Sequence, residues 1–143
     1  MDHFMKAAIE EARRSLSEGG IPIGAVLVRD GKILSRGHNR RVQDNDAMMH
    51  AEIACLRQAG RQKSYAGTVL YSTLMPCYLC AGAVVQFGIK RVVVAEAENL
   101  AGALDFMEGH GVEVTNLDLE EAKKLLGAFI ENNPQVWNED IGR

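Results

Sequence analysis

The chain has 143 residues, of which 47% are hydrophobic, and it carries a formal net charge of −3 at pH 7. This length and composition suit a single globular domain, which we expect to span residues 1–143. No uncharged apolar run is long enough to cross a bilayer, and residues 1–6 lack the pattern of a secretion signal, so we expect no membrane partner. The slightly acidic balance does not favour a surface that follows the phosphates of a nucleic acid.

Hydrophobic periodicity and turn residues divide the chain into alternating helices and strands. In chain order, we expect a helix at 2–18, a hairpin of strands 25–28 and 32–36 around the turn at 30–31, a helix at 50–59, a strand at 68–73, a helix at 77–87, a strand at 91–95, a helix at 101–108, a strand at 112–114 and a helix at 119–132. The valines of 91–95 predict a strand that is buried on both faces. Leu125 and Phe129 should point inward from the last helix, and a polar tail follows Pro134. This order predicts an α/β fold in three α/β/α layers, with a mixed and mostly parallel sheet at the centre.

The cysteine content indicates a reducing compartment and a metal or redox site. Cys55, Cys77 and Cys80 are too few and too odd in number to form a disulfide scaffold. We therefore expect a cytoplasmic protein. The spacing of Cys77 and Cys80 places both thiols on one face of the first turn of a helix, where the helix dipole favours thiolates.

Two short motifs together predict a catalytic zinc site. His50-Ala51-Glu52 and Pro76-Cys77-x-x-Cys80 each stand at the start of a predicted helix. One imidazole and two thiolates supply the three ligands of a catalytic zinc ion, whose fourth position is left for water. The pair of motifs matches the His-x-Glu and Pro-Cys-x-x-Cys signature of zinc deaminases, in which the glutamate is a general acid–base rather than a ligand. The competing interpretation is a closed structural zinc site, with Cys55, His38 or His110 as its fourth ligand.

The chain resembles the cytosine deaminases of fungi, within the cytidine-deaminase-like superfamily. The resemblance runs along nearly the whole chain. Besides the two zinc motifs, it rests on Gly-Gly-Ile-Pro-Ile-Gly at 19–24, Arg-Gly-His-Asn at 36–39, and the ending Pro-Gln-x-Trp-x-Glu-Asp-Ile-Gly at 134–142. The zinc motifs are common to the superfamily, whereas the ending discriminates among substrates.

This resemblance implies a homodimer, a central five-stranded sheet and the hydrolysis of cytosine to uracil and ammonia. It implies one zinc per chain on His50, Cys77 and Cys80, which activates a hydroxide, with Glu52 as the proton shuttle. The substrate base would be contacted by Asn39, Ala51 and Asp140, walled by Trp137, and touched by Leu74 and Ile23. Residues 134–143 would form a C-terminal tail over the active site.

Three positions depart from the fungal pattern: Ala51 stands in place of glycine, Met75 in place of serine, and Leu100 near the place of an aromatic residue. Because of Met75 and Leu100, the pattern does not define which ring substituents the base carries. Guanine or another aminoazine is the alternative substrate. Less favoured alternatives are a deaminase of adenosine in transfer RNA, which would need a basic surface, and a zinc module without turnover, for which the presence of Glu52 gives no support.

Overall fold

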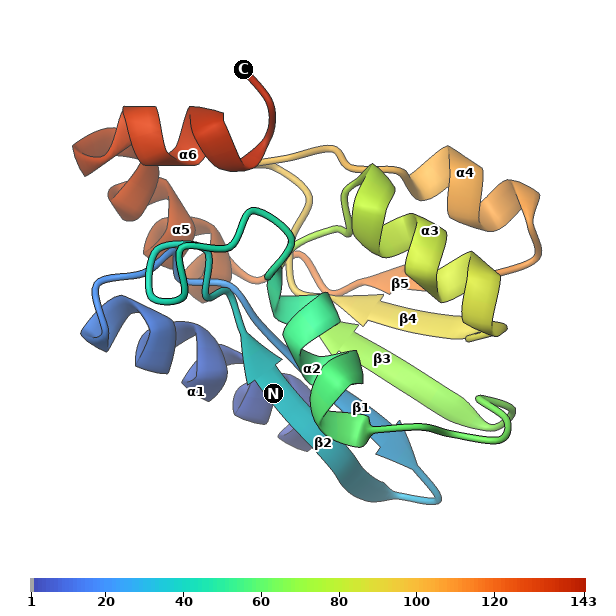
Figure 1. Cartoon of the computed structure of the whole chain (residues 1–143). Helices are drawn as coiled ribbons and strands as arrows, with labels where there is room; N and C mark the ends of the chain where they lie inside the picture. The colour runs from blue at the N-terminus through green and yellow to red at the C-terminus, as the bar shows by residue number, and fades with distance from the viewer. Residues whose placement is uncertain (1) are drawn as a thin grey trace.

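The computed structural model describes residues 2–143 as a five-stranded sheet with helices on both faces (Figure 1). The strands are β1 (Gly24–Arg29), β2 (Lys32–His38), β3 (Thr68–Ser72), β4 (Arg91–Val94) and β5 (Glu113–Asn116). The helices are α1 (His3–Ser17), α2 (Ala51–Ala59), α3 (Tyr78–Phe87), α4 (Leu104–Gly109), α5 (Glu120–Asn132) and α6 (Pro134–Asp140). The predicted three-layer α/β/α architecture is confirmed. No helix within residues 2–143 combines the length and apolar character that crossing a membrane requires.

The sheet is mixed, with the strand order β2-β1-β3-β4-β5. β1 pairs antiparallel with both β2 and β3, whereas β3, β4 and β5 pair parallel. The expectation of a mostly parallel sheet was wrong, because two of the four strand pairings, β1 with β2 and β1 with β3, are antiparallel. The turn of that hairpin has left-handed φ angles of 53° at Asp30 and 73° at Gly31, as a tight two-residue hairpin requires.

Two apolar clusters lie on opposite faces of the sheet. Along β1, Ala25 and Leu27 join the cluster with α2, α3 and α4, whereas Val26 and Val28 join the cluster with α1. This alternation is the two-residue period of a strand covered on both faces. The valines of β4 are buried as predicted.

Glycines bring α1 and α2 close to the first hairpin. A side chain at Gly24 would collide with the backbone of α1 at Ala8 and Ala12, and a side chain at Gly37 would collide with the backbone of α2 at Cys55. These close contacts fix α2, which carries part of the site, against the end of β2.

The end of the chain differs from the sequence-based expectation in two respects. Residues 134–140 form α6 rather than a polar tail, because Pro134 stands in the first turn of a helix, where its missing N–H is not needed. Trp137 of α6 is buried with 4% exposure in the same cluster as Leu126 and Phe129. In α5 it is Leu126, with 2% exposure, that enters the core, while Leu125 is only half-buried.

Candidate metal centre and active site

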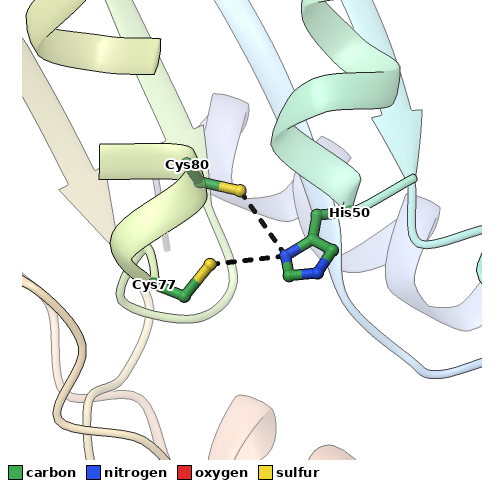
Figure 2. Close-up of side chains that lie close together, drawn as sticks. All are labelled: His50, Cys77 and Cys80. Carbon is green, nitrogen blue, oxygen red and sulfur yellow. Dashed lines mark hydrogen bonds between the residues drawn. The ribbon is translucent and has the colours of Figure 1, made fainter. Parts of the chain in front are cut away.

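The starts of two helices bring three metal-ligating side chains together. His50 is the N-cap residue of α2 and Cys77 is the N-cap residue of α3, and neither side chain caps its own helix. Cys80 lies in the first turn of α3. Both side chains at the N-caps are therefore free to point across the gap between the helices. Figure 2 shows the two sulfur atoms directed at the same ring nitrogen of His50.

The separations between these ligand atoms suit zinc. Nδ1 of His50 lies 3.4 Å from Sγ of Cys77 and 3.6 Å from Sγ of Cys80. The three atoms lie within 4.8 Å of one another. Tetrahedral zinc, with Zn–N bonds of about 2.05 Å and Zn–S bonds of about 2.3 Å, would hold nitrogen and sulfur about 3.6 Å apart. The three residues could therefore hold a single zinc ion and leave its fourth position open.

The residues considered as a fourth protein ligand lie elsewhere. Among residues 2–143, His50, Cys77 and Cys80 are the one group of such side chains found at metal-binding distances. Cys55 is fully buried, and burial raises the pKa of its thiol to about 12. His38 lies between two glutamates, and His110 is exposed. This arrangement favours an open catalytic site over a closed structural one.

The charges around His50 favour a bound cation. Burial lowers the pKa of His50, but a hydrogen bond with Cys77 and the negative charges of Asp140 and Glu52 outweigh it and raise the pKa to about 9. A hydrogen bond with Cys80 lowers the pKa of Cys77 to about 4 against the effect of burial. The same hydrogen bond and burial raise the pKa of Cys80. Zinc would release the protons that remain on these ligands, because it binds thiolates and neutral imidazole.

Glu52 lies beside the metal ligands without belonging to their group. It occupies the first turn of α2 and is buried with 4% exposure. Burial, followed by the negative charge of Cys77, raises the pKa of Glu52 to about 7. A carboxyl group that titrates near neutrality can both accept and donate a proton, as a general acid–base must.

The metal centre opens onto a small cavity. The lining comes from segments spread along the chain, namely Ile23, Asn39, His50, Ala51, Glu52, Leu74, Met75, Cys77, Leu100, Trp137, Asp140 and Ile141. Every residue that the resemblance places around the base is therefore in this lining. The volume of this cavity that the centre of a water-sized sphere can occupy is ≈ 20 Å³. This volume is roughly enough for one water molecule. The cavity is thus small, and α6 forms one of its walls.

Asn39, Asp140 and Arg41 form a polar contact between the loop after β2 and α6. The backbone N–H of Arg41 donates to Oδ1 of Asn39 at 2.9 Å, so Nδ2 of Asn39 faces Oδ2 of Asp140 at 3.4 Å. Nη1 of Arg41 lies 3.6 Å from Oδ1 of Asp140. Oδ1 is buried and accepts no hydrogen bond. Burial raises the pKa of Asp140, against the opposing charges of His50 and Arg41.

Sequence reasoning gave two residues of this site no role of their own. Ile141, which belongs to the ending at 134–142 that carries the resemblance, lines the cavity. Arg41 belongs to no motif and no periodic pattern, so nothing in the sequence singled it out.

Comparison with known proteins agrees with this geometry. The family of the cytidine and deoxycytidylate deaminase zinc-binding region matches residues 1–96. This match covers more than half of the chain and includes His50, Glu52, Cys77 and Cys80. The chain belongs to this family of zinc-binding deaminases, which supports a zinc-dependent hydrolase.

Proteins similar to this chain are named as deaminases of different substrates. A cytosine deaminase of Candida albicans is 43% identical over 141 residues, covering 96% of this chain and 94% of that protein. A structure from a study of A-to-I editing by tRNA:A34 deaminases superposes with a TM-score of 0.77 at 34% identity, covering 87% of this chain and 99% of the other. A guanine deaminase of Nitrosomonas europaea superposes with a TM-score of 0.76 at 26% identity, covering 88% and 82%.

Proposed function

We propose that this protein removes the amino group of a free nucleobase by hydrolysis, with cytosine as the preferred substrate and uracil and ammonia as products. The observation that carries the proposal is the buried Oδ1 of Asp140, which accepts no hydrogen bond, in the wall that α6 gives the cavity. A buried acceptor without a donor is unfavourable by about 1–3 kcal/mol. A ligand that presents an amino group would supply that donor. The 43% identity with a cytosine deaminase supports the same substrate.

Each residue near the metal centre has a defined part in this reaction. Zinc held by His50, Cys77 and Cys80 would lower the pKa of a water molecule to about 7 and so supply the nucleophile. Glu52 accepts a proton from the attacking water and delivers it to the ring nitrogen next to the amine-bearing carbon. Glu52 then takes the second proton of that water from the hydroxyl group now on the carbon and gives it to the amine nitrogen. The carbon–nitrogen bond breaks to release ammonia as the carbonyl group forms. Water is consumed, so atoms and charges balance.

The polar wall of the cavity recognises the edge of the base. Because Oδ1 of Asn39 accepts from Arg41, its amide nitrogen is the group left to donate to a carbonyl oxygen of the ring. Asp140 accepts from the amino group, and the backbone N–H of Ala51 provides a further donor. Trp137, Leu74 and Ile23 provide apolar contacts, as the resemblance implies.

The position of α6 favours a free base over a nucleoside. α6 contributes Trp137 and Asp140 to a cavity that is too small for a pyrimidine ring. We infer that α6 shifts when a ring enters, and a lid that then closes over the ring would leave no room for a ribose. Closure of this kind also excludes water from the site.

Two other substrates remain as alternatives. Guanine is the second candidate because of the structural similarity to a guanine deaminase. Adenosine in transfer RNA is the third, because of the similarity to a structure from work on tRNA:A34 deaminases. The tRNA alternative requires α6 to leave the cavity open to a polynucleotide, and guanine requires space for a second ring.

A substrate panel tests the proposal. The zinc-loaded protein is assayed for ammonia release from cytosine, 5-methylcytosine, isocytosine, guanine, adenine, cytidine, adenosine and a transfer RNA. We expect turnover of cytosine and none of cytidine. Faster ammonia release from guanine than from cytosine would identify guanine as the substrate. Faster release from the transfer RNA would identify adenosine in transfer RNA as the substrate.

We also propose that this protein forms the homodimer that the resemblance implies. The groove between α2 and α3 is lined by apolar side chains that include Ile53, Leu79 and Phe87, and Phe87 is 50% exposed. A second copy would remove this surface from water. Light scattering on the purified protein should give twice the chain mass, and the monomer mass would contradict the proposal.

A further inference from the structure

The histidine that precedes Asn39 is held at both ends of its ring. Nδ1 of His38 lies 2.9 Å from Oε1 of Glu11, and Nε2 lies 2.8 Å from Oε1 of Glu18. His38 is 8% exposed and Glu11 is 2% exposed. Contacts at opposite ends of a ring prevent it from turning. His38, at the end of β2, therefore connects this strand to Glu11 in α1 and to Glu18, the C-cap residue of α1.

Arginines balance the two glutamates independently of His38. Oε2 of Glu11 lies 3.0 Å from Nε of Arg36, and Oε1 of Glu18 lies 3.1 Å from Nη1 of Arg40. The same Nη1 of Arg40 is 3.2 Å from Nε2 of His38. Loss of the imidazole therefore leaves neither carboxylate without a cation, and a variant at position 38 should fold.

The backbone of Asn39 is also anchored to α1. Ser15 is fully buried, and its hydroxyl donates to the carbonyl oxygen of Asn39 at 2.7 Å. Gln43 donates to the same oxygen at 3.1 Å. The N–H of Asn39 donates to the carbonyl oxygen of Ile23 at 2.9 Å. Ser15 and His38 thus hold residues 38–39 through two separate contacts with α1.

On the basis of the proposed function, we propose that His38 and Ser15 are positioning residues that act on the substrate through Asn39. Neither lines the cavity, whereas Asn39 does. A binding group must be held to about 0.5 Å to keep its hydrogen bonds. Because Asn39 contacts the base rather than the water or Glu52, displacement of its carboxamide should weaken binding and leave the chemical step intact.

Steady-state kinetics separates this role from a purely structural one. His38→Ala and Ser15→Ala should each raise KM for cytosine roughly 3- to 10-fold, the value of one hydrogen bond, while kcat and zinc content stay near wild type. His38→Asn, whose amide nitrogen can reach Glu11, should recover part of the loss. His110→Ala, a change at an exposed histidine, is the matched control and should leave KM unchanged. Unchanged KM in both alanine variants, or a fall in kcat alone, would overturn the proposal.

A measurement without substrate distinguishes failure of this proposal from failure of the proposed function. The side-chain amide signals of Asn39 in a ¹⁵N–¹H spectrum are identified by their disappearance in Asn39→Asp. We expect them to shift or broaden in His38→Ala and Ser15→Ala, and to stay in place in His110→Ala. Unchanged signals in the two test variants would refute the positioning role, whichever base the protein deaminates.

Discussion

Oδ1 of Asp140 lies 3.6 Å from Nε2 of His50, although Asp140 belongs to the last helix and His50 to the start of α2. Nδ1 of the same ring faces the two cysteine sulfurs. His50 therefore links the metal centre on one side to the helix that walls the cavity on the other. The negative charge of Asp140 also contributes to the raised pKa of His50.

Replacement of Glu52 tests the proton shuttle. Glu52→Gln keeps the size of the side chain but cannot exchange a proton, so ammonia release should fall by roughly 10²- to 10⁴-fold or more. Zinc content and thermal stability should stay near wild type, because Glu52 is not in the ligand group. Metal analysis and an ammonia assay on the same preparation give both values. Activity near wild type would exclude the mechanism.

The cysteines should divide into two classes by their effect on zinc. Cys77→Ala and Cys80→Ala should lose the metal, because each removes one of the three ligands. Cys55→Ala should keep about one zinc per chain, because the Cys55 thiol faces Ser35 instead. Metal analysis after dialysis is the measurement. Loss of zinc from the Cys55 variant would point to a closed structural site.

Changes in α6 test its role as a lid. Deletion of residues 134–143 should abolish cytosine turnover while zinc and the helical signal persist, because the apolar wall and Asp140 are both removed. Asp140→Asn, which keeps the shape of the side chain, should lower activity without releasing zinc. Glu131→Gln, a change at an exposed residue of α5, is the control. A truncated protein that folds and deaminates cytosine normally would contradict both the lid and the substrate assignment.

A glycine substitution tests how α2 is held in place. Gly37→Ala would place its Cβ against the backbone of Cys55, and this overpacking should lower the free energy of unfolding by about 1–3 kcal/mol. Since α2 carries His50 and Glu52, activity should also fall. Gly127→Ala is the matched control, because the nearest atom to its added Cβ in α5 is Oδ1 of Asn99 at 3.7 Å, an ordinary contact, and it should stabilise by roughly 0.5–1 kcal/mol. Equal melting temperatures for the two variants would contradict this account.

Local patterns predicted most of the fold. The helix and strand positions before residue 133 follow from spacing of apolar residues and from glycines such as Gly60 and Gly88, which end α2 and α3 with positive φ. The order of the strands did not follow, since the antiparallel pairing of β1 with β3 depends on contacts between distant segments. α6 was missed because its formation depends on burial of Trp137.

The metal chemistry of this protein could be predicted from local motifs, because His50 and Glu52 are two positions apart and Cys77 and Cys80 are three positions apart. The residues that surround this chemistry could not be predicted in the same way. The contacts of Asp140 with His50, of Arg41 with Asp140 and of His38 with Glu11 join segments far apart in the chain. Such contacts form only when the helices pack on the two faces of the sheet. They therefore cannot be predicted from the spacing of residues along the chain.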